Sequence, residues 1–137
     1  RNLIEVDLKT GASHELKVQG EAVEGKLLKD PRYLADGRVV AYSVADRKTT
    51  LHVLTRDEST LTHAYAAPIR GSYLLLDGSL LLGGEDSIWG KKVGPKGLEP
   101  AFEIEAPEGE LAQAFDGRLF YYTDEGCFLV EGLPLAG

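Results

Sequence analysis

Short apolar runs alternate with polar, glycine-containing breaks along the whole chain. Runs such as residues 39–42, 51–54, 80–82 and 127–130 are only a few residues long. This length, bounded by turn residues, is typical of strands rather than helices. No segment shows a sustained apolar period of 3.6 residues with helix caps. The pattern predicts an all-β chain with almost no helix.

An Asp-Gly dipeptide between two apolar runs occurs three times, at residues 36–37, 77–78 and 116–117. Successive copies are 41 and 39 residues apart. Asp-Gly between apolar runs is a strong signal for a hairpin, because glycine tolerates the positive φ of a tight turn. The three aspartates are best explained as turn residues whose side chains bind the local backbone, rather than as a calcium-binding or acidic ring.

Two further markers keep the same spacing. Ala67-Pro68 and Ala106-Pro107 lie 39 residues apart, and proline there is typical of a loop between repeat units. An apolar strand follows each hairpin, at 51–54, 87–89 and 127–130, with an earlier copy at 3–8. Three markers in phase indicate an internal repeat.

Each complete repeat predicts a small antiparallel sheet of four strands in about 40 residues. Such a sheet has two apolar faces and must pack against its neighbours. The chain divides into a partial unit 1–19, complete units 20–66 and 67–105, and a partial unit 106–137.

This pattern resembles the blades of β-propellers, and is most similar to the TolB-like and WD-repeat-like kinds, whose inner hairpin carries an Asp-Gly turn. The Gly-His and Trp-Asp signature of true WD repeats is absent. The resemblance implies an all-β fold of four-stranded blades packed as a propeller or part of one. The units fall short of the four blades of the smallest usual propellers. The chain is therefore expected to be part of a longer propeller, to complete a ring with other copies, or to form a compact four-bladed ring. The start at Arg1 favours a fragment, from which a signal peptide could have been removed.

In a propeller, the loops after strands two and four share one face, where partners dock in the resembling family. Five residues in or beside these loops are candidates for partner binding: Arg47, Arg70, Asp86, Trp89 and Asp124. Tryptophan is enriched at binding hot spots, although the position of Trp89 in a strand between Ile88 and Gly90 favours packing between sheets. Solvated loop charges are the alternative explanation for the other four.

The histidines offer the main candidate chemistry. His52 and His63 are expected on adjacent strands, where Asp57 or Glu58 could complete a metal site or an acid–base pair. The alternative is a pair of cross-strand or surface histidines, since no metal-binding spacing supports the first idea. The serines lack a Gly-x-Ser-x-Gly elbow. We therefore predict no catalytic, metal-binding or cofactor-binding residue.

Composition excludes several classes. The net charge is −7 and the basic residues are scattered, which argues against nucleic acid as a partner. No apolar run is long enough for a membrane helix, so no membrane insertion is expected. Cys127, the single cysteine, excludes an intrachain disulfide and is expected to be a small buried side chain. One Asn, two Gln and no Met are typical of a thermophile or of a GC-rich genome.

Two functions fit these observations. The first is a non-catalytic binding or scaffold module that engages a protein, peptide or saccharide, with other copies or the remainder of a propeller as further partners. The second is an accessory propeller that gates substrate access in a larger hydrolase similar to prolyl oligopeptidase. The second would need a serine nucleophile with Asp and His partners elsewhere in the protein.

Overall fold

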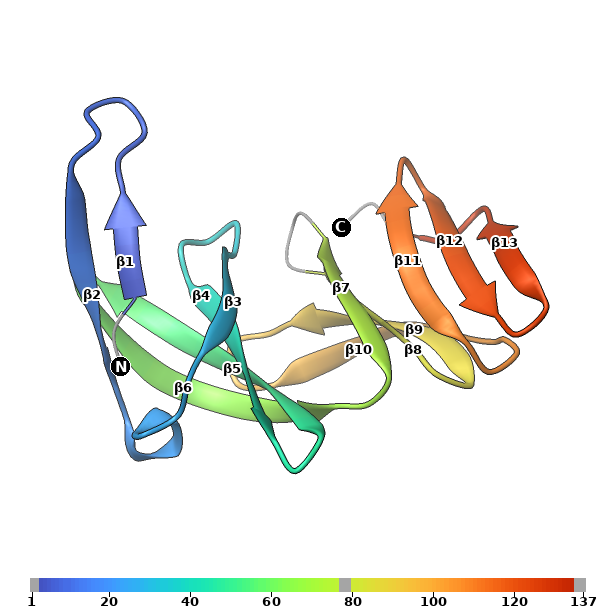
Figure 1. Ribbon diagram of the computed structural model, residues 1–137, viewed down its shortest axis with the longest axis horizontal. Coiled ribbons are helices and arrows are strands. Elements are labelled where there is room, and N and C mark those ends of the chain that lie inside the picture. The colour runs from blue at the N-terminus through green and yellow to red at the C-terminus, as the bar shows by residue number, and fades with distance from the viewer. Residues whose placement is uncertain (1–2, 77–79, 135–137) are drawn as a thin grey trace. The chain divides into compact units, whose positions relative to one another are not determined.

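The computed structural model describes residues 3–76 and 80–134 (Figure 1). These residues form thirteen strands and one short 3-10 helix, Glu21–Val23, so the predicted all-β class is confirmed. The chain divides into two compact units, residues 1–67 and 68–137. In the described ranges, no helix has the length and apolar character to span a bilayer.

The first unit is built on a curled sheet of six strands in the order β1-β2-β6-β5-β4-β3 (Figure 1). Its strands are β1 (Leu3–Val6), β2 (Ser13–Gln19), β3 (Lys29–Tyr33), β4 (Val39–Ala45), β5 (Lys48–Asp57) and β6 (Thr60–Ile69). The hairpin of β1 and β2 joins this sheet through parallel pairing of β2 with β6, from Lys17 opposite Thr60 to Gln19 opposite Thr62. The repeat predicted a sheet of four strands in this unit, which correspond to β3–β6. The pairing of β2 with β6 adds two more strands, β1 and β2, to the same sheet.

The core of the first unit lies around the centre of this sheet. Five buried side chains form one cluster: Leu16, Val23, Val39, Leu54 and Leu61. Residues 39–43 and 51–54 are buried without interruption, so both faces of β4 and β5 are covered at these positions. This explains why the sequence there reads as continuous apolar runs rather than as a strict alternation.

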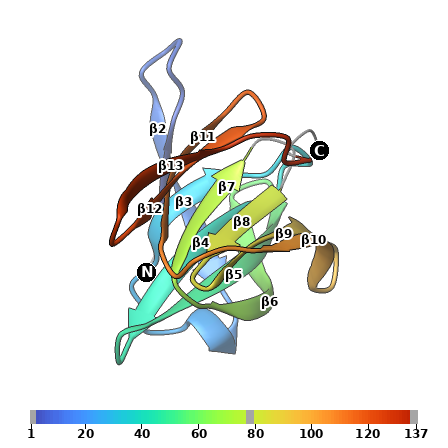
Figure 2. The same cartoon turned by 90° about the vertical axis from the view of Figure 1, so that its right-hand side faces the viewer.

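The second unit contains two antiparallel sheets. The first has the order β10-β9-β8-β7, with β7 (Ser72–Leu76), β8 (Leu80–Gly84), β9 (Ser87–Val93) and β10 (Leu98–Glu105). The second has the order β11-β12-β13, with β11 (Glu110–Phe115), β12 (Arg118–Thr123) and β13 (Gly126–Val130). In Figure 2 the sheet of β11–β13 lies in front of β7 and β8.

The two sheets of the second unit share one core. It joins Leu80, Leu82 and Ile88 of the four-stranded sheet to three residues of the other sheet, Leu111, Leu119 and Tyr121. Polar contacts fix the sheets at one end. The Ser72 hydroxyl accepts a hydrogen bond from the Leu111 amide at 2.7 Å and donates to the Gly84 carbonyl at 3.1 Å.

The Asp-Gly dipeptides join paired strands where the structure describes them. Residues 36–37 connect β3 to β4, and residues 116–117 connect β11 to β12. Gly37 and Gly117 have φ of 93° and 74°, which explains the need for glycine. The carboxylate of Asp36 accepts a hydrogen bond from the Arg38 amide at 3.1 Å, as expected of a turn residue. The third dipeptide, Asp77-Gly78, lies outside the described residues.

Two predictions about single residues are wrong. Pro68 lies inside β6 rather than in a loop, whereas Pro107 does follow the end of a strand. Proline is tolerated in β6 because it stands next to the strand's final residue. Cys127 is exposed rather than buried. The apolar run 127–130 belongs to an edge strand, where burial is incomplete, and a continuous apolar run does not reveal this.

Candidate functional site

A depression of about 630 Å³ lies over β9 and β10 of the second unit; we call it the Trp89 depression. Its lining comes from the chain just before β7, from the turn between β8 and β9, and from both strands. The lining residues are Arg70, Glu85, Asp86, Ser87, Trp89, Gly90, Lys91, Pro100, Ala101, Phe102 and Glu103.

Trp89 stands on β9, between the paired strands β8 and β10. It pairs with Gly83 on one side and with Glu103 on the other. A Cβ added at Gly83 would lie 1.9 Å from the Cζ2 atom of Trp89, so the indole lies directly against the backbone of β8. The ammonium of Lys91 lies 4.8 Å from the centre of the indole, a cation–π contact. The indole is therefore held in place while its residue stays partly exposed.

Charges of both signs surround the indole. Arg70 and Lys91 are basic, and three residues are acidic: Glu85, Asp86 and Glu103. The Ser87 hydroxyl donates a hydrogen bond to the Glu103 carboxylate at 2.9 Å, which fixes one of these acids. A flat apolar group beside carboxylates, one of which is held in place, suits a ligand that has both an apolar face and hydrogen-bond donors.

Three of the five residues predicted for partner binding, Arg70, Asp86 and Trp89, line the Trp89 depression. Asp124 lines a second depression of the same unit, of about 660 Å³, next to β11 and β12. Arg47 belongs to the first unit, where it is exposed in the tight turn between β4 and β5 with φ of 64°. The sequence did not indicate the remaining lining residues, such as Glu103, because their face depends on the register of β10.

The predicted proximity of His52 and His63 is also observed. The Nδ1 atom of His52 lies 3.2 Å from Nε2 of His63, with the rings 5.3 Å apart and edge to face. The Nε2 atom of His52 lies 2.7 Å from the hydroxyl of Ser43. The partner beside His52 is thus Ser43 of β4, rather than Asp57 or Glu58. Ser43 and His52 stand on paired strands, and only the register of β4 and β5 reveals their contact.

The chain of Ser43, His52 and His63 has the order of a nucleophile, a base and an orienting group. Its burial argues against catalysis, since Ser43 and His52 are only 7% and 1% exposed. Burial, together with the nearby His63 and Lys26, lowers the pKa of His52 to about 4. The pKa of His63 is also lowered, by burial and by Lys26. Both rings are therefore neutral at pH 7, and each hydrogen bond satisfies a polar group that burial removes from water.

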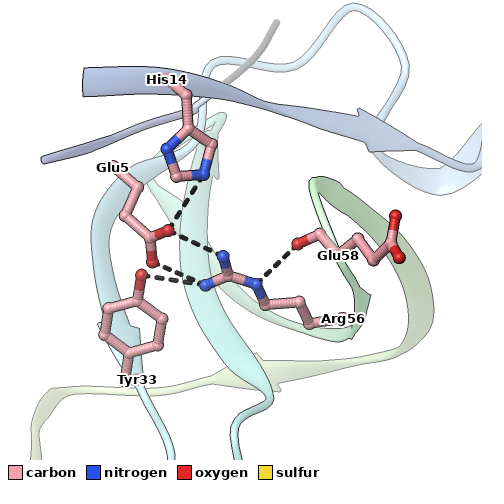
Figure 3. Close-up of polar contacts among 5 residues, drawn as sticks. All are labelled: Glu5, His14, Tyr33, Arg56 and Glu58. Carbon is pink, nitrogen blue, oxygen red and sulfur yellow. Dashed lines mark hydrogen bonds and ion pairs between the residues drawn. The ribbon is translucent and has the colours of Figure 1, made fainter. Parts of the chain in front are cut away.

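A second polar cluster of the first unit, the Arg56 cluster, was not visible in the sequence (Figure 3). The Arg56 guanidinium donates to both oxygens of Glu5, at 2.6 and 2.7 Å, and to the Tyr33 hydroxyl at 3.1 Å. His14 lies 3.1 Å from the same carboxylate. The hydrogen bonds from Arg56 lower the pKa of Glu5, and those to Glu5 raise the pKa of Arg56.

The Arg56 cluster joins strands that are far apart in the sheet. Glu5 stands on β1 and Tyr33 on β3, the two edge strands, and Arg56 reaches both from β5. An apolar pocket of about 230 Å³ lies beside it, lined by Leu3, Ile4, Glu5, Val6, Leu16, Pro31, Arg32, Tyr33 and Val39. Glu5 and Arg56 are 51 residues apart, so no local spacing could have indicated the pair. Because the charges of Arg56 and Glu5 are paired with each other, we interpret the Arg56 cluster as a stabilising contact rather than as a binding site.

No group of three or more His, Cys, Asp or Glu side chains suited to a metal ion occurs in the described part of the chain. Comparison of the chain with protein-family models, curated proteins and solved structures found no match.

Proposed function

We propose that this chain is a non-catalytic binding module and that the Trp89 depression is where it engages a basic peptide. The observation that carries the proposal is the placement of Trp89. Its ring is held against Gly83, lines an open depression of about 630 Å³, and already accepts the ammonium of Lys91. Large aromatic side chains that are rigid and partly exposed dominate the binding energy of protein interfaces.

The charges favour a basic peptide among the ligand classes considered. Three acidic and two basic side chains line the depression, and the whole chain carries a net charge of −7. A lysine or arginine of the ligand would take the place of Lys91 on the indole, with Glu103 or Asp86 as its ion-pair partner. The acidic chain would also speed the encounter with a basic partner and repel nucleic acid.

The single tryptophan makes the test direct, because all indole fluorescence comes from this site. The probe is an acetylated, amidated hexapeptide of alternating Lys and Gly, titrated against the chain with fluorescence and calorimetry. We expect a saturable change that weakens with salt, and no response to the matched Glu and Gly peptide. Trp89→Ala should weaken binding by about 2 kcal/mol, the effect of a hot-spot residue.

Matched variants separate the site from general charge attraction. Asp86→Asn and Glu103→Gln should weaken binding, whereas Asp57→Asn, which removes one exposed acid from the first unit, should not. A response to a neutral hexasaccharide instead of the Lys peptide would mean that the ligand is a saccharide. Binding of the Lys peptide that is equally strong in the Trp89→Ala chain would refute the site.

A second pair of variants tests whether the placement of the indole matters. Gly83→Ala adds a methyl group where the ring of Trp89 now lies, so the ring must move. We expect a shifted emission maximum and weaker binding. Gly97→Ala is the control, because a Cβ there meets nothing within 4 Å. Equal binding by both variants would show that the position of the ring is irrelevant.

We also propose that the repeat belongs to a β-propeller, in which the strands β7–β10 form one blade. Support comes from the spacing of the Asp-Gly dipeptides, 41 and 39 residues, and from the antiparallel order of these four strands. In such a blade the turns before β7 and between β8 and β9 lie at one end of the sheet. Both turns contribute to the Trp89 depression, through Arg70 and Asp86 respectively. A projection image of the protein by electron microscopy that lacks a ring of blades would refute this architecture.

A further inference from the structure

One face of the β11–β13 sheet is apolar and exposed; we call it the outer face. Leu119 and Tyr121 of β12 are buried against the four-stranded sheet, so their neighbours along the strand point the other way. Four large side chains on that side are well exposed: Phe115 at 75%, Phe120 at 45%, Tyr122 at 53% and Leu129 at 48%. Such a concentration on one small sheet marks an interaction surface.

The register arranges the outer face in three rows across the strands. Phe115 pairs with Arg118 in the first row, Gln113 with Phe120 and Leu129 in the middle row, and Glu110 with Tyr122 and Cys127 in the last row. The aromatic ring of Phe120 thus lies at the centre. A positive charge, Arg118, stands at one end of the strands, and a negative charge, Glu110, stands at the other.

We propose that the outer face binds the outer face of a second copy of this chain, sheet on sheet. The two copies are related by a two-fold axis that lies between the sheets and runs across the strands. A two-fold contact requires a patch that complements itself. This axis reverses the order of the rows, so Phe120 meets Phe120 and Leu129 meets Leu129. Arg118 then faces Tyr122 of the other copy, with Glu110 of that copy on the adjacent strand.

The charges select this orientation. An axis parallel to the strands would keep the order of the rows and place Arg118 against Arg118, which is repulsive. With the perpendicular axis, each copy contributes one Arg118 and one Glu110 to two equivalent contacts. Arg118 also approaches the ring of Tyr122, a favourable cation–π arrangement. The inner face of the same sheet already packs sheet on sheet through Leu119 and Tyr121, so the proposed contact repeats an arrangement present in the second unit.

Cys127 provides a reporter within the proposed interface. It is exposed and stands in the last row, opposite Tyr122. In the dimer it would be covered, yet the two copies of Cys127 would lie about 14 Å apart along the strands, since each row is two residues from the next. The dimer should therefore protect the thiol without forming a disulfide.

The test is the mass of the chain in solution, measured by light scattering and sedimentation over a concentration series in reducing buffer. We expect a reversible equilibrium between a species of 14.9 kDa and one of twice that mass. Over the same series, the rate at which a disulfide-exchange reagent modifies Cys127 should fall as dimer accumulates. A single 14.9 kDa species at every concentration, or a thiol rate independent of concentration, would overturn the proposal and leave the outer face to a neighbouring blade of a longer propeller.

Variants test the face and its orientation. Phe120→Lys should abolish the dimer, and Val44→Lys, at a similarly exposed residue of the first unit, should leave it unchanged. Arg118→Glu and Glu110→Arg should each weaken association about tenfold, because each affects both symmetric contacts. The double variant should restore it. The charge swap tests the same interface without relying on the folding of Phe120→Lys, since Arg118 and Glu110 are both exposed.

Single charge reversals without effect would refute the orientation. A dimer that persists in Phe120→Lys and is lost in Val44→Lys would place the contact on the first unit and refute the face. The outcome is independent of peptide binding, because none of these residues lines the Trp89 depression.

Discussion

The two units differ in where they place side chains capable of chemistry. In the first unit, the buried Ser43 and His52 and the partly buried His63 bind one another, and Arg56 binds Glu5 and Tyr33. In the second unit, Trp89 lines an open depression, and Phe120 stands on an exposed sheet face. Residue type alone would have favoured the histidines as a site. Burial and mutual satisfaction favour a structural role for the histidines, and the two surfaces that we propose for binding lie in the second unit.

The largest expected effect tests the structural role of His52. His52→Ala removes a side chain that is 1% exposed and deprives the Ser43 hydroxyl of its partner. We expect the free energy of unfolding to fall by about 3 kcal/mol, from the cavity and the unsatisfied hydroxyl together. Denaturant titration followed by circular dichroism measures it.

The matched control is His14→Ala, since the His14 side chain is half exposed. Substitutions at exposed positions usually change stability by no more than about 0.5 kcal/mol. Equal losses from the two variants would mean that the buried histidine contributes no more to the free energy of unfolding than an exposed histidine does. Peptide binding should be unchanged in folded His52→Ala, which would sharpen the contrast between the units.

The next effect is the dependence of stability on pH. The pKa of His52 is lowered to about 4 in the folded chain, from an ordinary value of 6.5. Between these values the unfolded chain binds more protons, so the stability conferred by neutral His52 is present above pH 6.5 and is lost as the pH falls toward 4. We expect a loss of about 2 kcal/mol between roughly pH 8 and pH 5, measured by denaturant titration.

His52→Gln should flatten this profile because glutamine does not titrate, although the lowered pKa of His63 will leave a part of it. His14→Gln should keep the full slope. If His52→Gln retains the slope of the natural chain, other groups cause the acid sensitivity.

The smallest effect concerns the Arg56 cluster. Arg56→Lys keeps the charge but loses the two parallel hydrogen bonds to Glu5. We expect a small decrease in the melting temperature that disappears at high salt, because the pair is close to solvent. Arg32→Lys is the control, since the Arg32 side chain contacts Asp30 through its Nε atom in a more exposed pair. A decrease as large as that of His52→Ala would mean that the cluster is a principal support of the curled sheet.

Much of the strand pattern could be predicted from local sequence. The Asp-Gly dipeptides at 36–37 and 116–117 lie between paired strands, and the apolar runs at 51–54, 87–89 and 127–130 are strands. These features depend on turn chemistry and on short-range alternation, which neighbouring residues decide. The exposure of Cys127 and the position of Pro68 inside β6 were missed, because the extent of a strand and the covering of its faces depend on distant segments.

The sequence by itself determined the all-β class, the position of most strands, and the acidic net charge. Only the tertiary structure decided which residues meet. The contact of His52 with Ser43, the contact of Arg56 with Glu5, and the gathering of Arg70, Asp86 and Trp89 around one depression depend on pairing and register. The physical reason is that a strand fixes only the alternation of its side chains. Which face is buried, and what lies across it, follows from the partner strands and sheets.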